Sequence, residues 1–159
     1  MKTAIDRVLG WVLIVLVSVM TINVLWQVFS RYVLSAPSSF TDELARFLLI
    51  WVGILGGAYA AGQGAHLAIE LLPQRLDEKG RHRLEKFIAF AILVFAVTVM
   101  IIGGSRLVLI TYSLGQISAA LKIPMAIVYA VLPIAGLVVS IYQLITLSQL
   151  MKAGPAKQQ

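Results

Sequence analysis

Four long apolar stretches, separated by polar segments, dominate the pattern of this chain. The first runs without a charge from Val8 to Ser30, and the last from Ile123 to Met151. A helix rises about 1.5 Å per residue, so roughly 20 apolar residues cross a hydrocarbon core about 30 Å thick. The pattern therefore predicts an all-α integral membrane protein with four transmembrane helices, in a single membrane domain over 1–159, at about 8–30, 40–62, 85–113 and 123–151.

Polar and proline residues mark the expected boundaries of these helices. The segment 35–39, Ser-Ala-Pro-Ser-Ser, ends the first helix. Ser39 with Asp42 three residues later fits a capping box, which places the start of the second helix at Ser39. Pro133 lies inside the fourth helix, where it removes a backbone donor and predicts a kink.

The segments outside the four stretches are polar. The connector 63–84 interleaves basic, acidic and leucine residues, which predicts a short interfacial amphipathic segment on the membrane surface; a solvated connector fits equally well. The tail 152–159 is expected to be disordered. Lys2 and Arg7 resemble the start of a secretory signal, but the apolar stretch after them is longer than a signal's. A retained first helix is therefore expected.

Composition supports a membrane protein and excludes several other classes. Of the 159 residues, 60% are hydrophobic and 13% are charged, against a usual charged share of about 25% in soluble domains. The net charge of +6 comes from basic residues that mostly flank the apolar stretches. The expected partner is thus the lipid bilayer and not a nucleic acid. The absence of cysteine excludes disulfides, thiolate nucleophiles and cysteine-bound metals.

Basic residues are distributed unequally between the two sides of the membrane. With four spans, the termini and the connector share one side, which carries nine of the 13 Lys and Arg residues. The other side carries four: Arg31, Arg46, Arg106 and Lys122. The positive-inside rule therefore predicts an N-in/C-in topology, with 63–86 cytoplasmic and with 31–41 and 113–122 periplasmic.

A layer of charged residues is expected where the first two helices meet. The uncharged part of the second helix, 47–62, is short for a span, so the helix must include Glu43 and Arg46 near one interface. Asp42 shares a helix face with them, and Arg31 should reach the same layer. Two interpretations stay open: a cluster that fixes the hairpin or docks a partner, and ordinary capping with a local ion pair.

The expected spans offer no catalytic chemistry. Their centres carry no charge, whereas autonomous transporters and channels usually place ionisable groups there. A transmembrane haem needs a histidine within the membrane, but His66 and His82 fall in the connector region. They are interpreted as polar surface residues. No catalytic residue, cofactor or metal site is therefore expected.

Other polar, small and aromatic residues have structural interpretations. Asn23 and Gln27 lie one turn apart on the first helix and could hydrogen-bond across helices; with Thr21 they could also belong to an ion path. Glycines and alanines of the second helix form a small-residue face suited to close packing. By default the aromatic residues are lipid-facing or interfacial anchors: Trp11, Trp26, Tyr32, Trp51, Tyr112, Tyr129 and Tyr142.

Two neighbouring segments carry a more specific pattern: 26–34 reads WQVFSRYVL and 41–51 reads TDELARFLLIW. This arrangement resembles the small membrane subunit of tripartite ATP-independent periplasmic (TRAP) transporters, the DctQ-like family. The resemblance covers nearly the whole chain, and this first block is its most specific part. Weaker agreement follows in Gly56-Gly57-Ala58, in 64–67 (GAHL), in 118–124 (SAALKIP), and at Tyr129 and Pro133.

The resemblance implies a multi-pass protein of the bacterial inner membrane that acts as a small scaffold subunit. Its implied partners are a large membrane transporter subunit, which moves an organic acid inward with sodium ions, and a periplasmic substrate-binding protein. C4-dicarboxylates, sialic acid and other carboxylates all fit, because the substrate site would lie in the other subunits. The candidate interface or structural residues are Arg31, Asp42, Glu43, Arg46, Trp51, His66, Ser118 and Lys122.

Two other classes compete with this interpretation. An autonomous four-helix homodimeric exporter typically carries a glutamate in the middle of its first helix, and 8–30 contains none. A membrane-bound redox subunit is disfavoured by the histidine positions. A scaffold subunit with no enzymatic activity fits the residues best.

Overall fold

The computed structural model describes residues 2–36, 38–63 and 78–152. Over these residues it contains no strand, apart from one isolated bridge between Ile117 and Pro124. Four helical rods are long and apolar enough to cross a membrane: Lys2–Tyr32, Ser39–Gly62, Gly80–Ser113 and Met125–Lys152. This confirms the all-α fold with four membrane helices. The tail 153–159 and the part 64–77 of the expected interfacial segment lie outside the described residues and stay predictions, whereas 78–84 belong to the third rod, which begins earlier than the expected residue 85.

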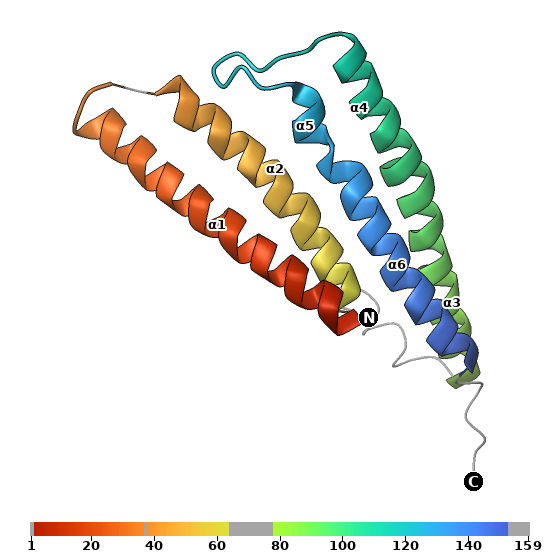
Figure 1. The fold of residues 1–159 in the computed structure, drawn as a ribbon. Helices are drawn as coiled ribbons and strands as arrows, with labels where there is room; N and C mark the ends of the chain where they lie inside the picture. The colour runs from red at the N-terminus through yellow and green to blue at the C-terminus, as the bar shows by residue number, and fades with distance from the viewer. Residues whose placement is uncertain (1, 37, 64–77, 153–159) are drawn as a thin grey trace.

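The first two rods form an antiparallel hairpin (Figure 1). Helix α1 (Lys2–Tyr32) begins before the uncharged stretch, and α2 (Ser39–Gly62) returns beside it. The capping residue is Ser38, one position before the expected Ser39: its hydroxyl accepts from the Thr41 N–H at 3.4 Å, and its carbonyl accepts from the Thr41 hydroxyl at 2.9 Å. The expected capping box is therefore wrong, because Ser39 already belongs to the helix.

The third rod contains a π-helical segment that the sequence pattern did not predict. Helix α3 (Glu78–Phe95) continues into a π-helical segment, η3 (Ala96–Gly103), and then into α4 (Gly104–Ser113). A π-helix has wider turns than an α-helix and is uncommon beyond a single turn. The third rod thus changes its helical winding along the stretch that faces the fourth rod.

The fourth rod is divided near its start. Helix α5 (Met125–Tyr129) is followed by Ala130 and then by α6 (Val131–Lys152). Pro133 has no N–H to donate to the carbonyl of Tyr129, four residues earlier, and α5 ends at Tyr129. The kink predicted from Pro133 is present as this break.

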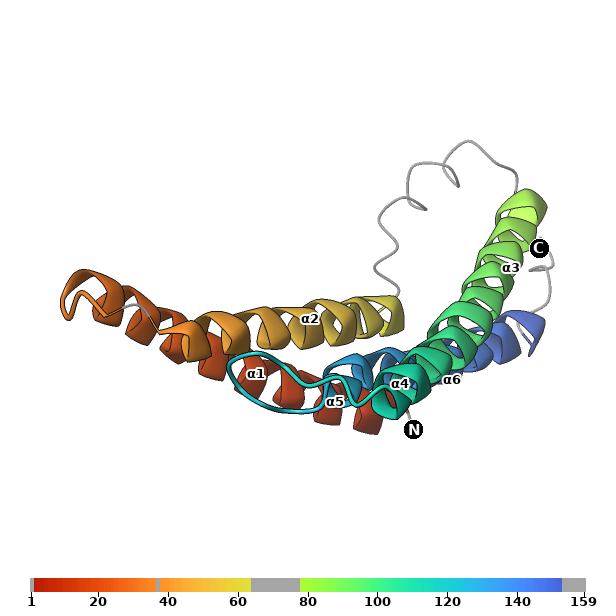
Figure 2. The same ribbon diagram turned by 90° about the horizontal axis from the view of Figure 1, so that it is seen from above.

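Helix α6 occupies the centre of the molecule. In the most apolar stretch of the fourth rod, which contains α6, 44% of the residues are buried within the chain, against 11% for the first rod. Seen from above, α1 and α2 form one arm and α3 with α6 the other, so the rods make an open curve (Figure 2). The buried core draws one or more residues from every rod: Leu9, Leu55, Ala58, Ala96, Val131, Ala135 and Val139.

Candidate functional site

The candidate site lies at the end of the bundle that holds the α1–α2 turn and the loop 114–124 (Figure 1). We call this the loop end, and we call the opposite end, where α1 begins and α6 ends, the terminal end. Both α1 and α2 bring polar side chains to the loop end, and the loop 114–124 brings backbone donors. The third and fourth rods, joined by this loop, form the second hairpin. The site therefore has two parts, one within the first hairpin and one between the two hairpins.

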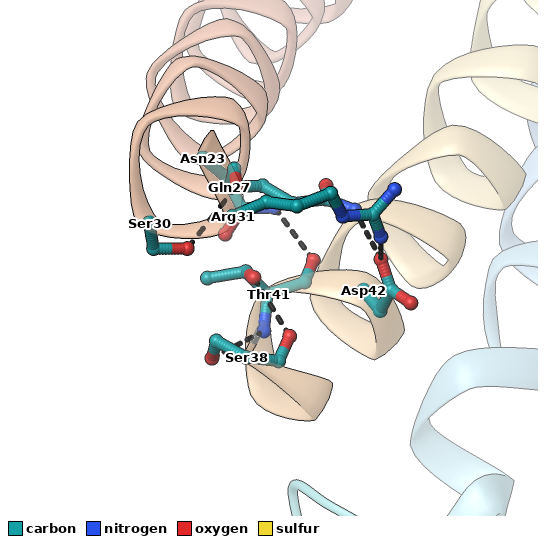
Figure 3. Close-up of polar contacts among 7 residues, drawn as sticks. All are labelled: Asn23, Gln27, Ser30, Arg31, Ser38, Thr41 and Asp42. Atoms are coloured by element: carbon teal, nitrogen blue, oxygen red, sulfur yellow. Dashed lines mark hydrogen bonds and ion pairs between the residues drawn. The ribbon is translucent and has the colours of Figure 1, made fainter. Parts of the chain in front are cut away.

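Within the first hairpin, two amides of α1 bind α2 (Figure 3). The buried side chain of Asn23 donates from Nδ2 to the carbonyl of Thr41 at 2.8 Å. One turn later, the Nε2 of Gln27 donates to the Asp42 carboxylate. These bonds confirm the predicted role of the two amides in joining helices. They hold the start of α2 against α1.

An ion pair extends this seam towards solvent. Nη2 of Arg31 lies 3.8 Å from Oδ1 of Asp42, and their side chains are 51% and 40% exposed. Such an exposed pair contributes only about 0–1 kcal/mol to stability. The structure thus brings together two of the predicted site residues, Arg31 and Asp42. Their ion pair adds to the bond between Gln27 and Asp42, which is the main link.

Glu43 binds a different part of the molecule from its neighbour Asp42. Its carboxylate accepts from three consecutive backbone N–H groups of the loop, those of Ala119 at 3.1 Å, Ala120 at 2.7 Å and Leu121 at 2.8 Å. Successive N–H groups that point inwards form a concave anion site. Glu43 thereby joins α2 to a loop 76–78 residues away in the sequence and links the two hairpins at the loop end.

Hydrogen bonds within the loop 114–124 fix the conformation that presents these N–H groups to Glu43. The ends of the loop are joined by bonds from the Ser118 N–H to the Ile123 carbonyl at 2.9 Å and from the Met125 N–H to the Gln116 carbonyl at 2.9 Å. The buried hydroxyl of Ser118 accepts from the Ile123 N–H at 3.3 Å. Lys122 has a φ of 57°, a left-handed conformation that is unusual for a residue with a side chain. The loop is therefore held in one conformation by its own bonds and by Glu43.

The remaining predicted residues lie apart from these bonds. Arg46 and Lys122 are exposed, and no hydrogen bond or ion pair joins the side chain of either to another described residue. Trp51 is partly buried and packs against the core cluster. His66 lies outside the described residues. Glu43 binds backbone donors of the loop, which the sequence pattern did not reveal, and not the neighbouring Arg46.

Tyr142 corrects another expectation. It was interpreted as a lipid-facing or interfacial anchor, but it is only 2% exposed, and its hydroxyl donates to the carboxylate of Asp6. Sequence reasoning passed over Asp6. The available signal was a single acidic residue between Lys2 and Arg7, close before the uncharged stretch that begins at Val8.

The hydrogen bonds of the site join separate parts of the chain. In the described portions, 2–36, 38–63 and 78–152, no group of three or more histidine, cysteine or acidic residues could hold a metal ion. Asn23, Gln27 and Glu43 bind backbone groups or other side chains, whereas the side chains of Arg46 and Lys122 are exposed. The arrangement can fix helices and expose cations.

Comparison with known proteins agrees with the sequence pattern. The model of the family described as "Tripartite ATP-independent periplasmic transporters, DctQ component" matches residues 20–153. The matched range includes the α1–α2 seam, Glu43 and the loop 114–124. It excludes Asp6.

Individual relatives point the same way. The chain is 30% identical to the small permease protein of the ectoine TRAP transporter of Halomonas elongata, over 91% of this chain and 74% of that protein. It is 32% identical to the small permease protein of the sialic acid TRAP transporter of Vibrio cholerae, over 49% of this chain and 45% of that protein. The chain thus spans less than half the length of the sialic acid relative. A sialic acid TRAP transporter permease protein of Haemophilus influenzae is 32% identical over 43% of this chain and 11% of its own length.

Proposed function

Because the chain belongs to the DctQ component family of TRAP transporters, and so is a multi-pass protein of the bacterial inner membrane, we propose that it is the small scaffold subunit of a sodium-driven importer of an organic acid. A large membrane subunit carries the substrate, and a periplasmic binding protein delivers it. Two of the relatives are named for sialic acid and for ectoine, and both of these compounds carry a carboxylate. That shared group supports an organic acid as the substrate here.

The link between Glu43 and the loop 114–124 carries this proposal. The bonds of Asn23, Gln27 and Glu43 all join one part of the chain to another, and the centres of the spans hold no charge. A transport site needs groups that are free to bind and release a substrate or an ion. Polar groups committed to holding helices together suit a rigid support beside a moving partner.

A large membrane partner is supported by the relatives and by the surface. A permease protein of Haemophilus influenzae contains, within its much longer chain, a segment similar to this chain. Large apolar side chains are also exposed on all four rods. Lipid covers part of such a surface, and the large subunit is proposed to cover another part.

The loop end is proposed to face the periplasm and to meet the binding protein. Asp42 and Glu43 are engaged by their own partners, whereas Arg46 and Lys122 are exposed beside them. The loop end therefore offers cations held on a rigid base. Acidic groups on the binding protein would complement this surface.

Reconstitution tests the scaffold role directly. Proteoliposomes with the large subunit and the binding protein should take up the organic acid with sodium only when this chain is also present. This chain with the binding protein, but without the large subunit, should show no uptake. Uptake by this chain alone would contradict the proposal, as would full uptake in its absence.

Glu43→Ala tests the observation that carries the proposal. The variant should still insert and assemble, because the apolar rods drive insertion. Its uptake per assembled complex should fall roughly fivefold or more, because three charge-assisted bonds to the loop are lost together. Exchanging Glu43 and Arg46 should not restore uptake, because an arginine at position 43 cannot accept the loop N–H groups.

A carboxylate that stays within one helix provides the control for Glu43. Glu85 pairs with Arg81 one turn away on α3, and so Glu85→Ala should leave uptake unchanged. Equal uptake by the Glu43→Ala and Glu85→Ala complexes would mean that the loop link has no role in transport.

Cysteine labelling tests the orientation. The chain has no native cysteine, so Gln116→Cys in the loop and Thr3→Cys at the start of α1 can each be labelled alone. Both positions are exposed. An impermeant thiol reagent added to cells with a permeabilised outer membrane should label position 116 and leave position 3 unlabelled. The reverse pattern would invert the proposed topology.

A further inference from the structure

The terminal end has a junction between three helices that the transport proposal does not use. Tyr142 of α6 is among the largest fully buried side chains in the molecule. Its hydroxyl donates to the carboxylate of Asp6 on α1. Its ring lies against Gly62, the last residue of α2. One side chain therefore contacts both helices of the first hairpin from the centre of the second.

Gly62 allows this close approach. A Cβ atom at position 62 would lie 2.5 Å from both Cε2 and Cζ of the Tyr142 ring, a separation that real Cβ atoms essentially never show. Any side chain there would push the ring away from α2 and its hydroxyl away from Asp6. Gly57, on the same helix, has nothing within 4 Å of the corresponding point. The requirement for glycine is thus specific to the position beside Tyr142.

The carboxylate of Asp6 lies where it needs a hydrogen-bond donor. Tyr142 lies ten residues before Lys152, the last residue of α6, which corresponds to about 15 Å of helix. Asp6 meets it there and is itself partly buried. A carboxylate at such a place is unfavourable unless a donor binds it. Leu9, one turn further along α1, is also buried, so this face of α1 is held against the bundle.

We infer that Asp6 and Tyr142 form a clasp that sets the angle between the two hairpins at the terminal end. Glu43 joins the hairpins at the loop end, and the clasp joins them at the other. Between these two points the core residues of α2 and α6 pack together, and the clasp adds a directional bond that restricts pivoting at the terminal end. In transport, Asp6 and Tyr142 are positioning residues for the large subunit, a role that rests on the proposed scaffold function.

Distances between spin labels measure the angle directly. One label pair, Ala4→Cys with Arg83→Cys, spans the hairpins at the terminal end; a second pair, Tyr32→Cys with Tyr112→Cys, spans them at the loop end. All four positions are exposed, and the chain has no other cysteine. Pulsed electron paramagnetic resonance on the full chain in lipid nanodiscs gives a distance distribution for each pair.

Tyr142→Phe removes the hydroxyl and keeps the ring. It should increase the width of the distance distribution at the terminal end roughly twofold. The width at the loop end should stay unchanged, because only the hydrogen bond between Tyr142 and Asp6 is lost. Asp6→Ala should act in the same way. Asp6→Asn, whose amide oxygen still accepts, should keep the distribution narrow. Equal widths in the wild type and Tyr142→Phe would overturn the clasp, as would an Asp6→Asn distribution as broad as that of Asp6→Ala.

A glycine pair gives a second, independent measurement. Gly62→Ala should broaden the distribution at the terminal end, and Gly57→Ala on the same helix should not. Identical behaviour of the two alanine variants would overturn the clasp. Co-purification with the large subunit, measured separately, tests the scaffold function. A clasp variant whose distance distribution is broader but that still co-purifies with the large subunit supports both the clasp and the scaffold function. If the wild-type chain does not co-purify with the large subunit, only the scaffold function is overturned.

Discussion

Within each hairpin the two helical rods are held together by different physical means. In the first, α1 and α2 are joined by a polar seam in which Asn23 and Gln27 donate to α2. Only 11% of the most apolar stretch of each of these helices is buried within the chain. In the second, α6 packs closely against α3 and η3, and the most apolar stretch of the fourth rod is 44% buried.

Close approach in the second hairpin depends on two glycines. A Cβ at Gly136 of α6 would lie 2.8 Å from the Met100 Cβ of η3, and a Cβ at Gly104 of α4 would lie 2.9 Å from the Leu132 Cβ of α6. Lipid is as apolar as a leucine side chain, so burial alone does not drive membrane helices together. The second hairpin gains its contact from tight packing, and the first from hydrogen bonds made away from water.

The largest effect is expected where the second hairpin has no free space. Gly136→Ala should lower the free energy of unfolding by about 1–3 kcal/mol, because the new methyl group meets the bases of the Met100 and Ile101 side chains and not their flexible ends. Thermal unfolding of the purified chain in detergent, followed by helical circular dichroism, measures this loss.

Gly103→Ala is the matched control on the facing rod. A Cβ there would meet only the Thr98 carbonyl oxygen, at an ordinary 3.7 Å. Its stability should stay close to that of the wild type. If Gly136→Ala were as stable as Gly103→Ala, tight packing would not be what holds the second hairpin.

An intermediate effect is expected in the polar seam. Asn23→Leu removes the bond to the Thr41 carbonyl and should cost about 0.6 kcal/mol, the average for hydrogen bonds between membrane helices, and at most about 1.7 kcal/mol. The same unfolding measurement applies. Thr21→Val on the same helix is the control, because the exposed Thr21 hydroxyl bonds only to Val17 of its own helix. A loss in the control as large as that in Asn23→Leu would rule out the seam as the cause.

The smallest effect is expected at the exposed edge of the seam. Arg31→Gln should change the free energy of unfolding by about 0–1 kcal/mol, because its pair with Asp42 is half exposed at 3.8 Å. High salt should abolish the difference from the wild type, since salt screens exposed charges. A larger loss that persists in high salt would make Arg31 a main link of the first hairpin.

Much of the fold was predictable because membrane insertion depends on local composition. Uncharged stretches such as 8–30 and 123–151 predict helices without knowledge of any partner, since every backbone group within the bilayer must find its bond inside the segment. The pairing of Asn23 and Gln27 with a neighbouring helix was also predictable, because polar amides in a span need partners. The π-helical winding of 96–103 was not, since no residue there differs from those of an ordinary apolar helix.

The candidate site was only half predictable. Arg31, Asp42 and Glu43 were marked by their charge in a chain with few charges. Their partners were not marked, because Glu43 binds backbone N–H groups, which every loop possesses. Tyr142 was placed at the surface by the usual preference of tyrosine for the membrane interface, and only the presence of Gly62 and Asp6 beside it reverses that preference.

By itself, the sequence determined that this chain lies in a membrane, how many times it crosses, and which family pattern it carries, because these depend on residues close together along the chain. Only the tertiary structure decided that Asp42 and Glu43, adjacent in sequence, bind different hairpins, and that Asp6 meets a tyrosine 136 residues away. The physical reason is that a helix turns by about 100° per residue, so neighbouring side chains face different partners. Which partner stands on each side depends on how the rods pack.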